Sequence, residues 1–347
     1  MIRVAILGGG IGAQHLAAYA HLDGFAVTHL VDQDVDRRTA LCREKITPLS
    51  TVEDALAADV DLIDICLPPH LHAPVAIASL DAGKHVICEK PLATSMAQVD
   101  AISNAAARTG MSVFPVFQYR FGPAFDKLQA LQAAGLVGAA RAASLETHWN
   151  RGADYYAVPW RGTWAGEQGG AVLGHAIHAH DLLTRFLAPI EGVAARLGTI
   201  VNPIETEDSA ALIFDLEGGA LATSSVTLGS ARDETRLRFV YEHLTVTSHT
   251  NPYAPGEGKW QFVARDPARQ ALVDQVCADV VPGPVGFAGF LPEVGKAIEG
   301  APNSAVTLED GAASVALVTA IYASHRRGVR VSLPISADDP MREGWQP

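Results

Sequence analysis

Apolar residues in the first third of the chain follow two patterns that alternate. Short continuous apolar runs of strand type are separated by segments in which apolar positions follow a helical period. The runs predicted to be strands are residues 2–7, 25–31, 62–67, 85–88 and 112–117. The segments predicted to be helices are residues 13–22, 36–45, 73–81 and 95–108. Buried strands alternating with helices predict an α/β Rossmann domain with a doubly wound parallel sheet.

The pattern changes after Phe121, where longer stretches alternate apolar and polar residues. They predict strands joined by short turns, with a hairpin turn at residues 217–219. The predicted strands are 139–148, 190–200, 209–216, 221–228, 237–240, 244–248 and 329–333, and the predicted helices are 125–134, 289–298 and 308–324. We therefore expect a Rossmann domain at residues 1–121 and an α+β domain with a largely antiparallel open sheet at 122–347. One face of that sheet is expected to be free for a partner subunit.

The net charge and the spacing of the cysteines indicate which binding partners and which cellular compartment to expect. The 347 residues carry a formal net charge of −12, and the charges are scattered, so we expect neither nucleic acid nor an anionic membrane surface as partner. No apolar stretch reaches the roughly 20 residues that span a bilayer, and the chain starts on a strand rather than on a secretory leader. Cys42, Cys66, Cys88 and Cys277 form no C-x-x-C pair, so free thiols in the reducing cytoplasm are expected.

A glycine-rich turn joins the first predicted strand to the first predicted helix. Segment 8–13 fits G-x-G-x-x-A through Gly8, Gly10 and Ala13. Gly8 would form the turn, Gly10 would let a pyrophosphate approach the backbone, and Ala13 would let the helix pack closely on the strand. Such turns also occur as plain links between strand and helix, so the turn alone leaves a cofactor open. The neighbouring candidate cofactor contacts are Ile11 and Gly12.

Asp32 ends the second predicted strand, about 20 residues after the glycine turn, where dinucleotide-binding domains carry an acidic residue. A carboxylate there accepts hydrogen bonds from a ribose and repels a 2′-phosphate, which favours NAD over NADP. Arg37, a further candidate contact, and Arg38 weaken this preference, because a nearby arginine can hold a 2′-phosphate. A strand-end Asp is by itself usually a helix cap, but together with the glycine turn it predicts bound NAD.

Two segments follow the next two predicted strands: CLPPHLH at 66–72 and AGKHVICEKPLA at 82–93. They resemble the pattern T-P-x-x-x-H and A-G-K-H-V-x-x-E-K-P of the glucose–fructose oxidoreductase/inositol dehydrogenase (Gfo/Idh/MocA) family, with Leu67 in place of the usual Thr. The resemblance implies that Lys90 lies in the active site beside the nicotinamide and that the Lys90–Pro91 peptide is cis. Desolvation and the positive nicotinamide would lower the pKa of this lysine towards neutrality, so that it could relay a proton. Further candidate cofactor contacts here are Cys66, Leu67, Pro68, His72 and Glu89.

Gln118, Tyr119, Arg120 and Phe121 resemble the family segment N-x-R-F, with Gln118 in place of the usual Asn. The resemblance implies that the Gln118 amide touches the nicotinamide and that the chain then crosses to the second domain. Arg120 is a candidate substrate contact. A surface salt bridge is the alternative for this arginine.

The segment GGAVLGHAIHAHD at 169–181 resembles the family motif G-G-x-x-x-D-x-G-x-H-x-x-D through His178 and Asp181. On a helix, His175, His178 and Asp181 share one face, while His180 turns away. His178 is suited to act as general base on a substrate hydroxyl, because its pKa lies near working pH. Asp181 could hold a second hydroxyl.

One residue departs from the family pattern. The resemblance implies an Asp four residues before the catalytic His, but Gly174 stands there, so His175, Asp181 or Lys90 would have to take its part. The histidines 175, 178 and 180 with Asp181 are also a possible metal ligand set. Because His180 lies on the wrong face for a shared ion, no metal is predicted.

Polar and aromatic residues before this helix suggest a carbohydrate site. His148 and Asn150 resemble an H-x-N of the family's inositol dehydrogenases that contacts polyol hydroxyls, and Trp160 and Arg161 resemble a family P-W-R segment. Aromatic rings suit the C–H faces of a sugar, and polar groups suit its hydroxyls. Loop aromatics that only anchor the loop to the core are the alternative.

Together these features predict a NAD-dependent dehydrogenase acting on a secondary alcohol of a sugar, cyclitol or related polyol. His178, assisted by Lys90, would take the hydroxyl proton. Two alternatives remain: a sugar lyase or glycosidase-type enzyme that uses tightly bound NAD transiently, and a non-catalytic NAD(P)-binding regulator. Analogy with the family implies a homodimer or homotetramer formed through the C-terminal sheet.

Overall fold

The chain folds as two compact units, and the computed structural model describes residues 1–42 and 45–347. The first unit comprises Met1–Phe117 and Phe290–Val315. The second comprises Gln118–Gly289 and Ala316–Pro347. The boundary expected at residue 121 therefore lies after Phe117, and residues 290–315, which the sequence pattern assigned to the second domain, return to the first.

Two glycines explain why the later segment belongs to the first unit. A Cβ on Gly295 would lie 3.1 Å from the ring of Phe25. A Cβ on Gly311 would lie 2.6 Å from the Pro115 side chain and 2.8 Å from that of Leu92. The missing side chains let this returning segment approach the first unit closely. Nothing in the local pattern of the segment signals this packing.

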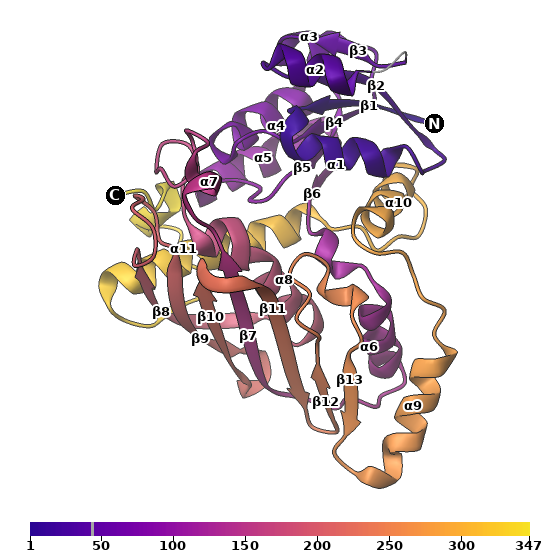
Figure 1. Ribbon diagram of the computed structural model, residues 1–347, viewed down its shortest axis with the longest axis vertical. Coiled ribbons are helices and arrows are strands. Elements are labelled where there is room, and N and C mark those ends of the chain that lie inside the picture. Colours follow the sequence, from indigo (N-terminus) through magenta and orange to yellow (C-terminus); the bar gives the residue numbers. More distant parts are fainter. Residues whose placement is uncertain (43–44) are drawn as a thin grey trace. The chain divides into compact units, whose positions relative to one another are not determined.

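The first unit contains a six-stranded sheet in the order β3-β2-β1-β4-β5-β6 (Figure 1). Every neighbouring pair is parallel, as predicted for a doubly wound fold. The strands are β1 Ile2–Leu7, β2 Phe25–Val31, β3 Thr47–Leu49, β4 Leu62–Ile65, β5 His85–Cys88 and β6 Val113–Pro115. The helices are α1 Gly9–Tyr19, α2 Val35–Leu41, α3 Val52–Ala57, α4 His72–Asp81 and α5 Met96–Thr109. The helix predicted at 36–45 is observed up to Leu41, and residues 43–44 lie outside the described residues.

Local sequence explains where these helices begin and end. The Thr51 hydroxyl accepts a hydrogen bond from the Asp54 N–H at 3.1 Å and caps α3. The Ser95 hydroxyl caps α5 in the same way, and the left-handed Gly110, with φ 73°, ends it. Such caps satisfy main-chain groups that the first and last helical turns leave unpaired.

The second unit contains an eight-stranded sheet in the order β13-β12-β11-β7-β10-β9-β8-β14. Strands β7 and β10 pair in parallel and the other neighbours pair antiparallel, so the sheet is mixed but mostly antiparallel, as expected. The strands are β7 Ala140–Asn150, β8 Ile190–Gly198, β9 Ser209–Leu216, β10 Leu221–Thr227, β11 Gly229–Tyr241, β12 Leu244–Thr247, β13 Gln261–Ala264 and β14 Val331–Ser332. The predicted hairpin turn is observed at Glu217–Gly219, between β9 and β10.

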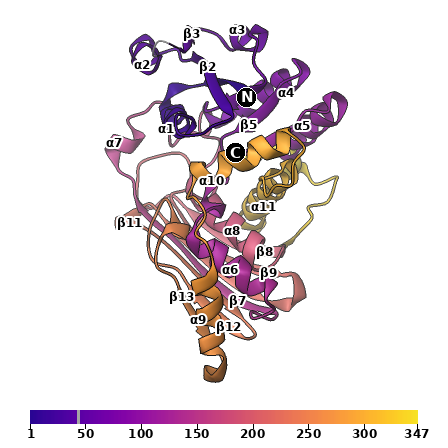
Figure 2. The ribbon, with the colours of Figure 1, turned by 90° about the vertical axis from the view of Figure 1, so that its right-hand side faces the viewer.

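Helices border this sheet, and α6 and α9 lie side by side (Figure 2). The helical elements are α6 Pro123–Ala133, α7 Ala153–Tyr156, a π-helical turn Val172–Ala176, α8 Ile177–Phe186 and α9 Gln270–Asp279. Helices α10 Phe287–Ile298 and α11 Leu308–Arg327 contribute residues to both units. The sequence pattern predicted neither α9 nor β13. Helix α9 buries only Val273 and so lacks an apolar stripe, and β13 is a four-residue edge strand.

The two faces of the eight-stranded sheet differ, as side-chain alternation on β10 illustrates. Ser224 is buried, and its hydroxyl lies 3.0 Å from Nε2 of His180 on α8, whereas Ser225 is exposed. One face therefore packs on α8. The opposite face leaves Ile213, Leu221 and Val263 54%, 56% and 53% exposed.

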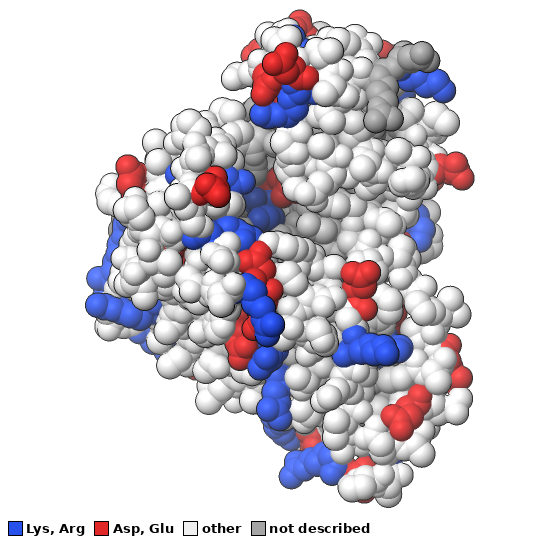
Figure 3. Space-filling view, viewed as in Figure 1, with Lys and Arg blue, Asp and Glu red and all other residues white. Residues whose placement is uncertain are grey.

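Charged side chains are mixed on the face drawn in Figure 3, where Lys and Arg alternate with Asp and Glu. This agrees with the scattered charges of the sequence. Among the described residues, none of the helices has the length and apolar character needed to cross a membrane.

Candidate active site

The main chain of the glycine turn after β1 packs against Cys66 at Gly8, and the space beside Gly10 is open. Gly8 has a φ of 95°, and a Cβ there would lie 2.5 Å from the Cys66 carbonyl oxygen, so both conformation and space require glycine. A Cβ on Gly10 would have no described atom within 4 Å. Gly10 and Ile11 are exposed at the start of α1. Free N–H groups beside open space at a helix N-terminus fit the phosphates of a dinucleotide.

Close approach of α1 to the sheet depends on Gly12. A Cβ on Gly12 would lie 2.9 Å from the Ile6 side chain and 3.4 Å from the Cys66 Cβ. Gly12 is buried, whereas Ala13 is only half-buried. The packing role predicted for Ala13 therefore belongs to Gly12.

Asp32 lies against the glycine turn with 7% of the residue exposed. Its carboxylate accepts hydrogen bonds from the N–H of Gly9 at 2.6 Å and of Asp34 at 2.8 Å. Nη1 of Arg37 lies 3.3 Å from Asp32 Oδ2, and Nη2 of the same arginine lies 3.0 Å from Asp34 Oδ2. Because the Arg37 guanidinium already pairs with two carboxylates, it is less available to bind the 2′-phosphate of NADP. A carboxylate has about four acceptor positions, so Asp32 keeps capacity for a ribose hydroxyl.

His72 lies beneath the loops that follow β4 and β5. Its Nδ1 lies 2.6 Å from the Pro91 carbonyl oxygen, and its Nε2 lies 2.7 Å from that of Leu67. Both ring nitrogens lie next to main-chain carbonyl oxygens, so His72 links the two loops, and its predicted contact with the cofactor stays a prediction. Leu67 and Pro68 are half-buried in the first loop. Lys90 is half-buried after β5, at the edge where parallel sheets bind ligands, and its peptide bond to Pro91 is cis, as the resemblance implies.

A buried charged network that the sequence reasoning missed links α1 to the Lys90 loop. Nδ1 of His15 lies 2.9 Å from Asp64 Oδ2, and Nε2 lies 3.0 Å from Glu89 Oε1. Tyr19 donates to Asp64 at 3.1 Å. Burial opposes charge on His15, but the Asp64 carboxylate raises the pKa of His15 well above its usual value. A polar Asp64 inside an otherwise apolar strand was the signal available in the sequence.

Glu89 connects this network to the main chain of Lys90. Its Oε2 accepts a hydrogen bond from the Lys90 N–H at 3.1 Å. Burial opposes ionisation of Glu89, yet His15 and Lys90 leave the pKa of its carboxyl below the usual value. Glu89, predicted as a cofactor contact, therefore positions the segment that carries Lys90. Cys66, another predicted contact, is buried, and burial raises the pKa of its thiol, so its carbonyl is the group that meets the glycine turn.

Residues 1–42 and 45–347 contain one group with metal-ligand spacing, formed by His15, Asp64 and Cys66. The hydrogen bond between His15 and Asp64 accounts for that spacing. The helix histidines weighed above as metal ligands are not such a group in this described part. His180 turns away from the other two, as predicted, and burial lowers its pKa to about 3, so this ring is neutral.

In the second unit, Glu207 holds the start of the helical segment that carries His178. Its carboxylate accepts hydrogen bonds from the N–H of Gly170 at 3.1 Å, the N–H of Val172 at 3.0 Å and the Tyr322 hydroxyl at 2.7 Å. A Cβ on Gly170 would collide with the Glu207 carbonyl oxygen, which explains the glycine. Burial raises the pKa of Glu207 to about 7 although these donors lower it. No motif pointed to Glu207.

The turn Gln118–Arg120 packs on the face of α8 that bears His178 and Asp181. The rings of Tyr119 and His178 stack with centroids 4.1 Å apart and planes 16° apart. The Asp181 carboxylate accepts hydrogen bonds from Arg120 Nη2 at 2.6 Å and Nε at 2.8 Å. The two side chains of this ion pair are 9% and 4% exposed, so the surface salt bridge considered for Arg120 is in fact buried.

His175 faces a different set of neighbours from His178. Its Nε2 lies 3.3 Å from the Tyr155 hydroxyl, and its ring meets that of Trp149 edge-on at 5.2 Å. His175 lies in the π-helical turn Val172–Ala176, which changes the angular spacing along the helix. The shared face predicted from a regular helix therefore holds for His178 and Asp181 but not fully for His175.

Arg161 joins the aromatic side chains of the preceding loop. Its guanidinium lies 4.0 Å from the Tyr155 ring centre and 4.6 Å from that of Trp160, and it donates to the Tyr155 hydroxyl. Through Tyr155 this cluster reaches His175. The structure thus brings together Trp160, Arg161 and His175, three of the predicted substrate contacts.

His148 and Asn150 lie away from this cluster, and their substrate role stays a prediction. Side chains alternate along β7, so Trp149 is buried towards α8 while residues 148 and 150 point to the other face. His148 Nε2 lies 3.0 Å from the hydroxyl of the exposed Ser225. Trp149, which contacts His175, occupies the side on which the polar pair was expected.

Gln118 retains an acceptor without a partner. Its Oε1 is buried and finds no hydrogen-bond donor among the described residues. Buried polar atoms in native proteins are nearly always paired, so a ligand that donates an N–H fits here. A carboxamide supplies such a donor. In the second unit, this atom is therefore a candidate acceptor for a carboxamide N–H.

Two family models match the sequence. Residues 2–117 match GFO_IDH_MocA, described as the oxidoreductase family with an NAD-binding Rossmann fold. Residues 125–247 match the GFO/IDH/MocA C-terminal domain. The chain belongs to the Gfo/Idh/MocA oxidoreductase family. Its first unit is the NAD-binding domain, and NAD is the cofactor, as predicted.

Curated Gfo/Idh/MocA relatives include enzymes named for polyol substrates. Inositol 2-dehydrogenase of Rhodococcus erythropolis is 36% identical over 145 residues, which cover 40% of this chain and 41% of that protein. Levoglucosan dehydrogenase of Pseudarthrobacter phenanthrenivorans is 28% identical over 233 residues, 61% of this chain and 58% of that protein. The matched region thus spans less than two thirds of either relative.

Solved Gfo/Idh/MocA structures match over nearly the whole chain. The WlbA dehydrogenase of Chromobacterium violaceum, in complex with NADH and UDP-GlcNAcA, has a TM-score of 0.85 and 28% identity and covers 96% of both chains. The WlbA dehydrogenase of Bordetella pertussis, with the same two ligands, has a TM-score of 0.85 and 27% identity over 96% of this chain and 99% of that one. A levoglucosan dehydrogenase in complex with NADH and levoglucosan has a TM-score of 0.80 at 21% identity, which supports the fold alone.

Proposed function

We propose that this protein is an NAD-dependent dehydrogenase that oxidises a secondary alcohol of a sugar, cyclitol or related polyol. The observation that carries the proposal is the setting of His178, a buried imidazole stacked on Tyr119 beside the oriented carboxylate of Asp181. Membership of an NAD-binding oxidoreductase family supplies the reaction class. Relatives named inositol and levoglucosan dehydrogenase support the polyol class.

The cofactor contacts follow from the geometry of single residues. We assign the pyrophosphate to the N–H groups of Gly10, Ile11 and Gly12, the ribose to Asp32 and the carboxamide to Gln118. Bound NAD supplies the acceptor for the substrate's hydride. The chain's own residues bind both molecules, orient them and move the proton.

We assign removal of the hydroxyl proton to His178, with Lys90 assisting. An imidazole takes a proton near neutral pH, and stacking on Tyr119 limits the rotation of this ring. Arg120 holds the Asp181 carboxylate in a fixed direction, so that a remaining lone pair can accept a neighbouring substrate hydroxyl. Glu89 fixes the main chain of Lys90.

The cluster of Tyr155, Trp160 and Arg161 suits a sugar ring. Aromatic faces cover C–H groups, while the guanidinium donates to hydroxyl oxygens. Trp149 extends the aromatic surface to His175. We therefore propose Trp149 as a further substrate contact.

A spectrophotometric screen tests the proposal. Reduction of NAD and NADP is followed with sugars, sugar acids, glycosides and inositols, for the wild type and for Lys90→Ala and His178→Asn. Loss of a general base lowers kcat/KM by about 10²–10⁴-fold, and we expect this in both variants with the Kd for NAD nearly unchanged. His180→Gln is the matched control, because this histidine is on the same helix but faces Ser224.

The outcomes of the screen distinguish the dehydrogenase proposal from its alternatives. Absence of turnover with every polyol would refute the dehydrogenase proposal. Preference for NADP would contradict the role of Asp32. Product formed without net NADH would favour the lyase or glycosidase-type alternative, and full activity of both variants would contradict the assignment of the proton to Lys90 and His178.

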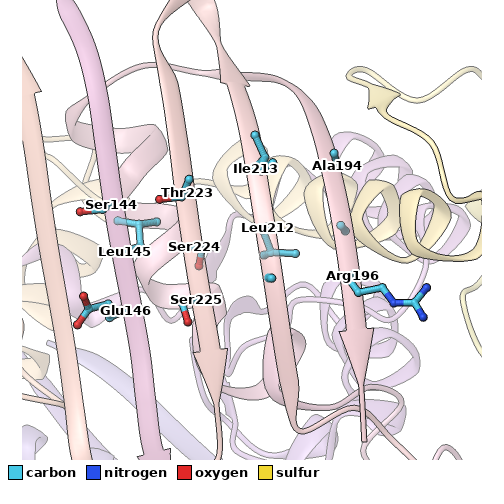
Figure 4. Close-up of a pocket in the computed structure, with 12 residues that line it drawn as sticks. Ser144, Leu145, Glu146, Ala194, Arg196, Leu212, Ile213, Thr223, Ser224 and Ser225 are labelled. Atoms are coloured by element: carbon cyan, nitrogen blue, oxygen red, sulfur yellow. The ribbon is translucent and has the colours of Figure 1, made fainter.

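We also propose that copies of the chain associate as a homodimer or homotetramer through the exposed face of the eight-stranded sheet. A shallow hollow of about 560 Å³ runs across β7, β10, β9 and β8 on this sheet (Figure 4). The exposed Ile213 lines it, Leu221 is exposed on the same face of the sheet, and such apolar groups favour association. Sedimentation should detect the oligomer, and Ile213→Lys should dissociate it, whereas Leu272→Lys, at an equally exposed position on α9, should not. A monomeric wild type would contradict the proposal.

A cytoplasmic location is proposed from the cysteines. Cys42, Cys66, Cys88 and Cys277 are all free thiols, as reducing compartments favour. Burial raises the pKa of Cys88 well above its usual value, so that thiol is unreactive as well as unpaired. Fractionation of the native cells with a cytoplasmic marker tests the location.

A further inference from the structure

Glu167 ends the loop that leads into the helical segment of His178, and only 5% of this residue is exposed. Its Oε2 accepts a hydrogen bond from the Gly162 N–H at 2.6 Å. Its Oε1 lies 4.0 Å from Nη1 of Arg161. These contacts fix the direction of the carboxylate, with one oxygen held by the loop and the other turned towards the helix.

Gly174 is the helical residue that Oε1 of Glu167 approaches. A Cβ on Gly174 would lie 3.6 Å from this oxygen. Apart from its chain neighbours and the helix backbone, no other described atom would lie within 4 Å of that Cβ. The loop carboxylate therefore occupies the space into which a side chain at position 174 would grow.

His178 follows Gly174 by four positions. Four positions make slightly more than one turn of an α-helix and slightly less than one turn of a π-helix, so Gly174, in the π-helical turn, and His178 lie on the same side of the helical segment. The Glu167 carboxylate thus lies on the side of the helix that bears His178. A negative charge there stabilises the imidazolium that forms when the ring takes a proton.

Two of the residues considered above as replacements for the missing helix Asp, Asp181 and His175, have other neighbours. The Asp181 carboxylate binds Arg120 through both oxygens. His175 lies against Tyr155 and Trp149. Neither arrangement is directed at the gap beside Gly174, whereas the Glu167 carboxylate is.

We propose that Glu167 is a positioning residue for His178, and that its carboxylate, supplied by the loop rather than by the helix, orients the imidazole and stabilises its protonated form. The kinetic part of this proposal rests on the dehydrogenase function proposed above. The electrostatic part concerns the protein without substrate. Titratable groups on the elements near His178 include Tyr119, whose ring stacks on it, Arg120 and Asp181, which pair with each other, and His175, which Tyr155 contacts.

NMR titration tests the electrostatic part. The imidazole signal of His178 is assigned by its absence in His178→Asn, and its pKa is measured in the wild type and in Glu167→Gln. The glutamine keeps the size of the side chain and an acceptor for Gly162, so we expect the pKa of His178 to fall by about one unit. Glu205→Gln is the matched control, because the exposed Glu205 also accepts a loop N–H, from Trp164 at 2.8 Å. An unchanged pKa in Glu167→Gln, or an equal fall in the control, would overturn the proposal.

Moving the carboxylate onto the helix tests the kinetic part. Glu167→Gln should lower kcat about tenfold with little change in KM, and should shift the acid limb of the kcat profile with the pKa of His178. Gly174→Asp added to Glu167→Gln should restore kcat to within about threefold, since a carboxylate returns to the same space. A double variant no more active than Glu167→Gln would overturn the proposal.

Gly174→Asp alone provides a test that does not depend on the folding of Glu167→Gln. It places a second carboxylate against the first, and their repulsion raises the pKa of one of the two; at a pH at which both are ionised, the added charge should raise the pKa of His178. An unchanged pKa would show that charge at this place does not reach the imidazole, and would overturn the proposal. Because the NMR measurements need no substrate, failure to find a polyol substrate would refute the dehydrogenase function and leave this result standing.

Discussion

Glu207 should make the start of the helical segment that carries His178 less stable as the pH rises. Its carboxyl binds the N–H groups of Gly170 and Val172 and the Tyr322 hydroxyl. Burial nevertheless raises its pKa from the ordinary 4.5 to about 7. The folded protein therefore holds this proton more tightly than the unfolded chain does. The protonated carboxyl contributes its full stabilisation at a pH below the pKa of Glu207 in the unfolded chain. This stabilisation is lost as the pH rises through the pKa of Glu207 in the folded protein.

The size of the effect follows from the shift. One pKa unit corresponds to about 1.4 kcal/mol, so the shift of Glu207 removes about 3 kcal/mol between about pH 4 and about pH 8. Local opening of residues 169–176 should become about 100-fold more frequent over that range. His180 on the same helix does not add to this pH dependence, because burial lowers its pKa to about 3.

Hydrogen exchange measured by mass spectrometry provides the assay. Protection of the peptide covering residues 169–176, corrected for the intrinsic effect of pH on exchange, should fall with rising pH. Glu207→Gln should lower protection at acid pH, because an amide cannot accept from all three donors, but should abolish the pH dependence. Equal corrected protection of the wild type at pH 5 and pH 8, or an unchanged slope in Glu207→Gln, would refute the reasoning.

Three further substitutions have expected results. Gly8→Ala should weaken NAD binding at least about tenfold in calorimetry, because its Cβ meets the Cys66 carbonyl, whereas Gly24→Ala, with a similar φ of 97° and open space around it, should cost about 1 kcal/mol of stability and leave the Kd unchanged. Arg120→Ala should destabilise the second unit in urea by about 3–5 kcal/mol by leaving a buried carboxylate unpaired, and the loss should shrink when Asp181→Ala is added. Trp345→Ala should cost about 3–5 kcal/mol in the same assay, since this fully buried ring stacks on Tyr322.

The sequence predicted five of the six strands of the first sheet but not the short β3, because β1, β4, β5 and β6 are almost entirely buried and β2 partly so. Continuous apolar runs gave the exact bounds of β1, β2 and β5. The return of residues 290–315 to this unit could not be predicted in the same way. It depends on Gly295 and Gly311 fitting against side chains far away in the sequence, and a helix pattern carries no information about which sheet it packs on.

The site shows both the use and the limit of motif reasoning. The motif assigned to His178 and Asp181 agrees with side chains that the fold holds in position through Tyr119 and Arg120. The H-x-N resemblance at residue 148 placed both polar residues with the aromatic cluster, whereas alternation along the strand puts them on the other face of the sheet. Residues 143, 145, 147 and 149 form the buried series of β7, which leaves 148 and 150 on the opposite face.

The two carboxylates that contact the helical segment of His178 from outside it are not marked by any motif in the sequence. Glu167 and Glu207 reach the helical segment of His178 from a loop and from the residues just before β9, and neither stands at a helical spacing from the histidine. The trace in the sequence is the absence of a side chain at Gly170, just before the helical segment, and at Gly174, within it. At both positions a carboxylate or a carbonyl from elsewhere in the chain lies next to the missing Cβ. A glycine inside a helix that bears catalytic residues is therefore a reason to look for a group that enters from outside the helix, and Gly174 leads in this way to Glu167.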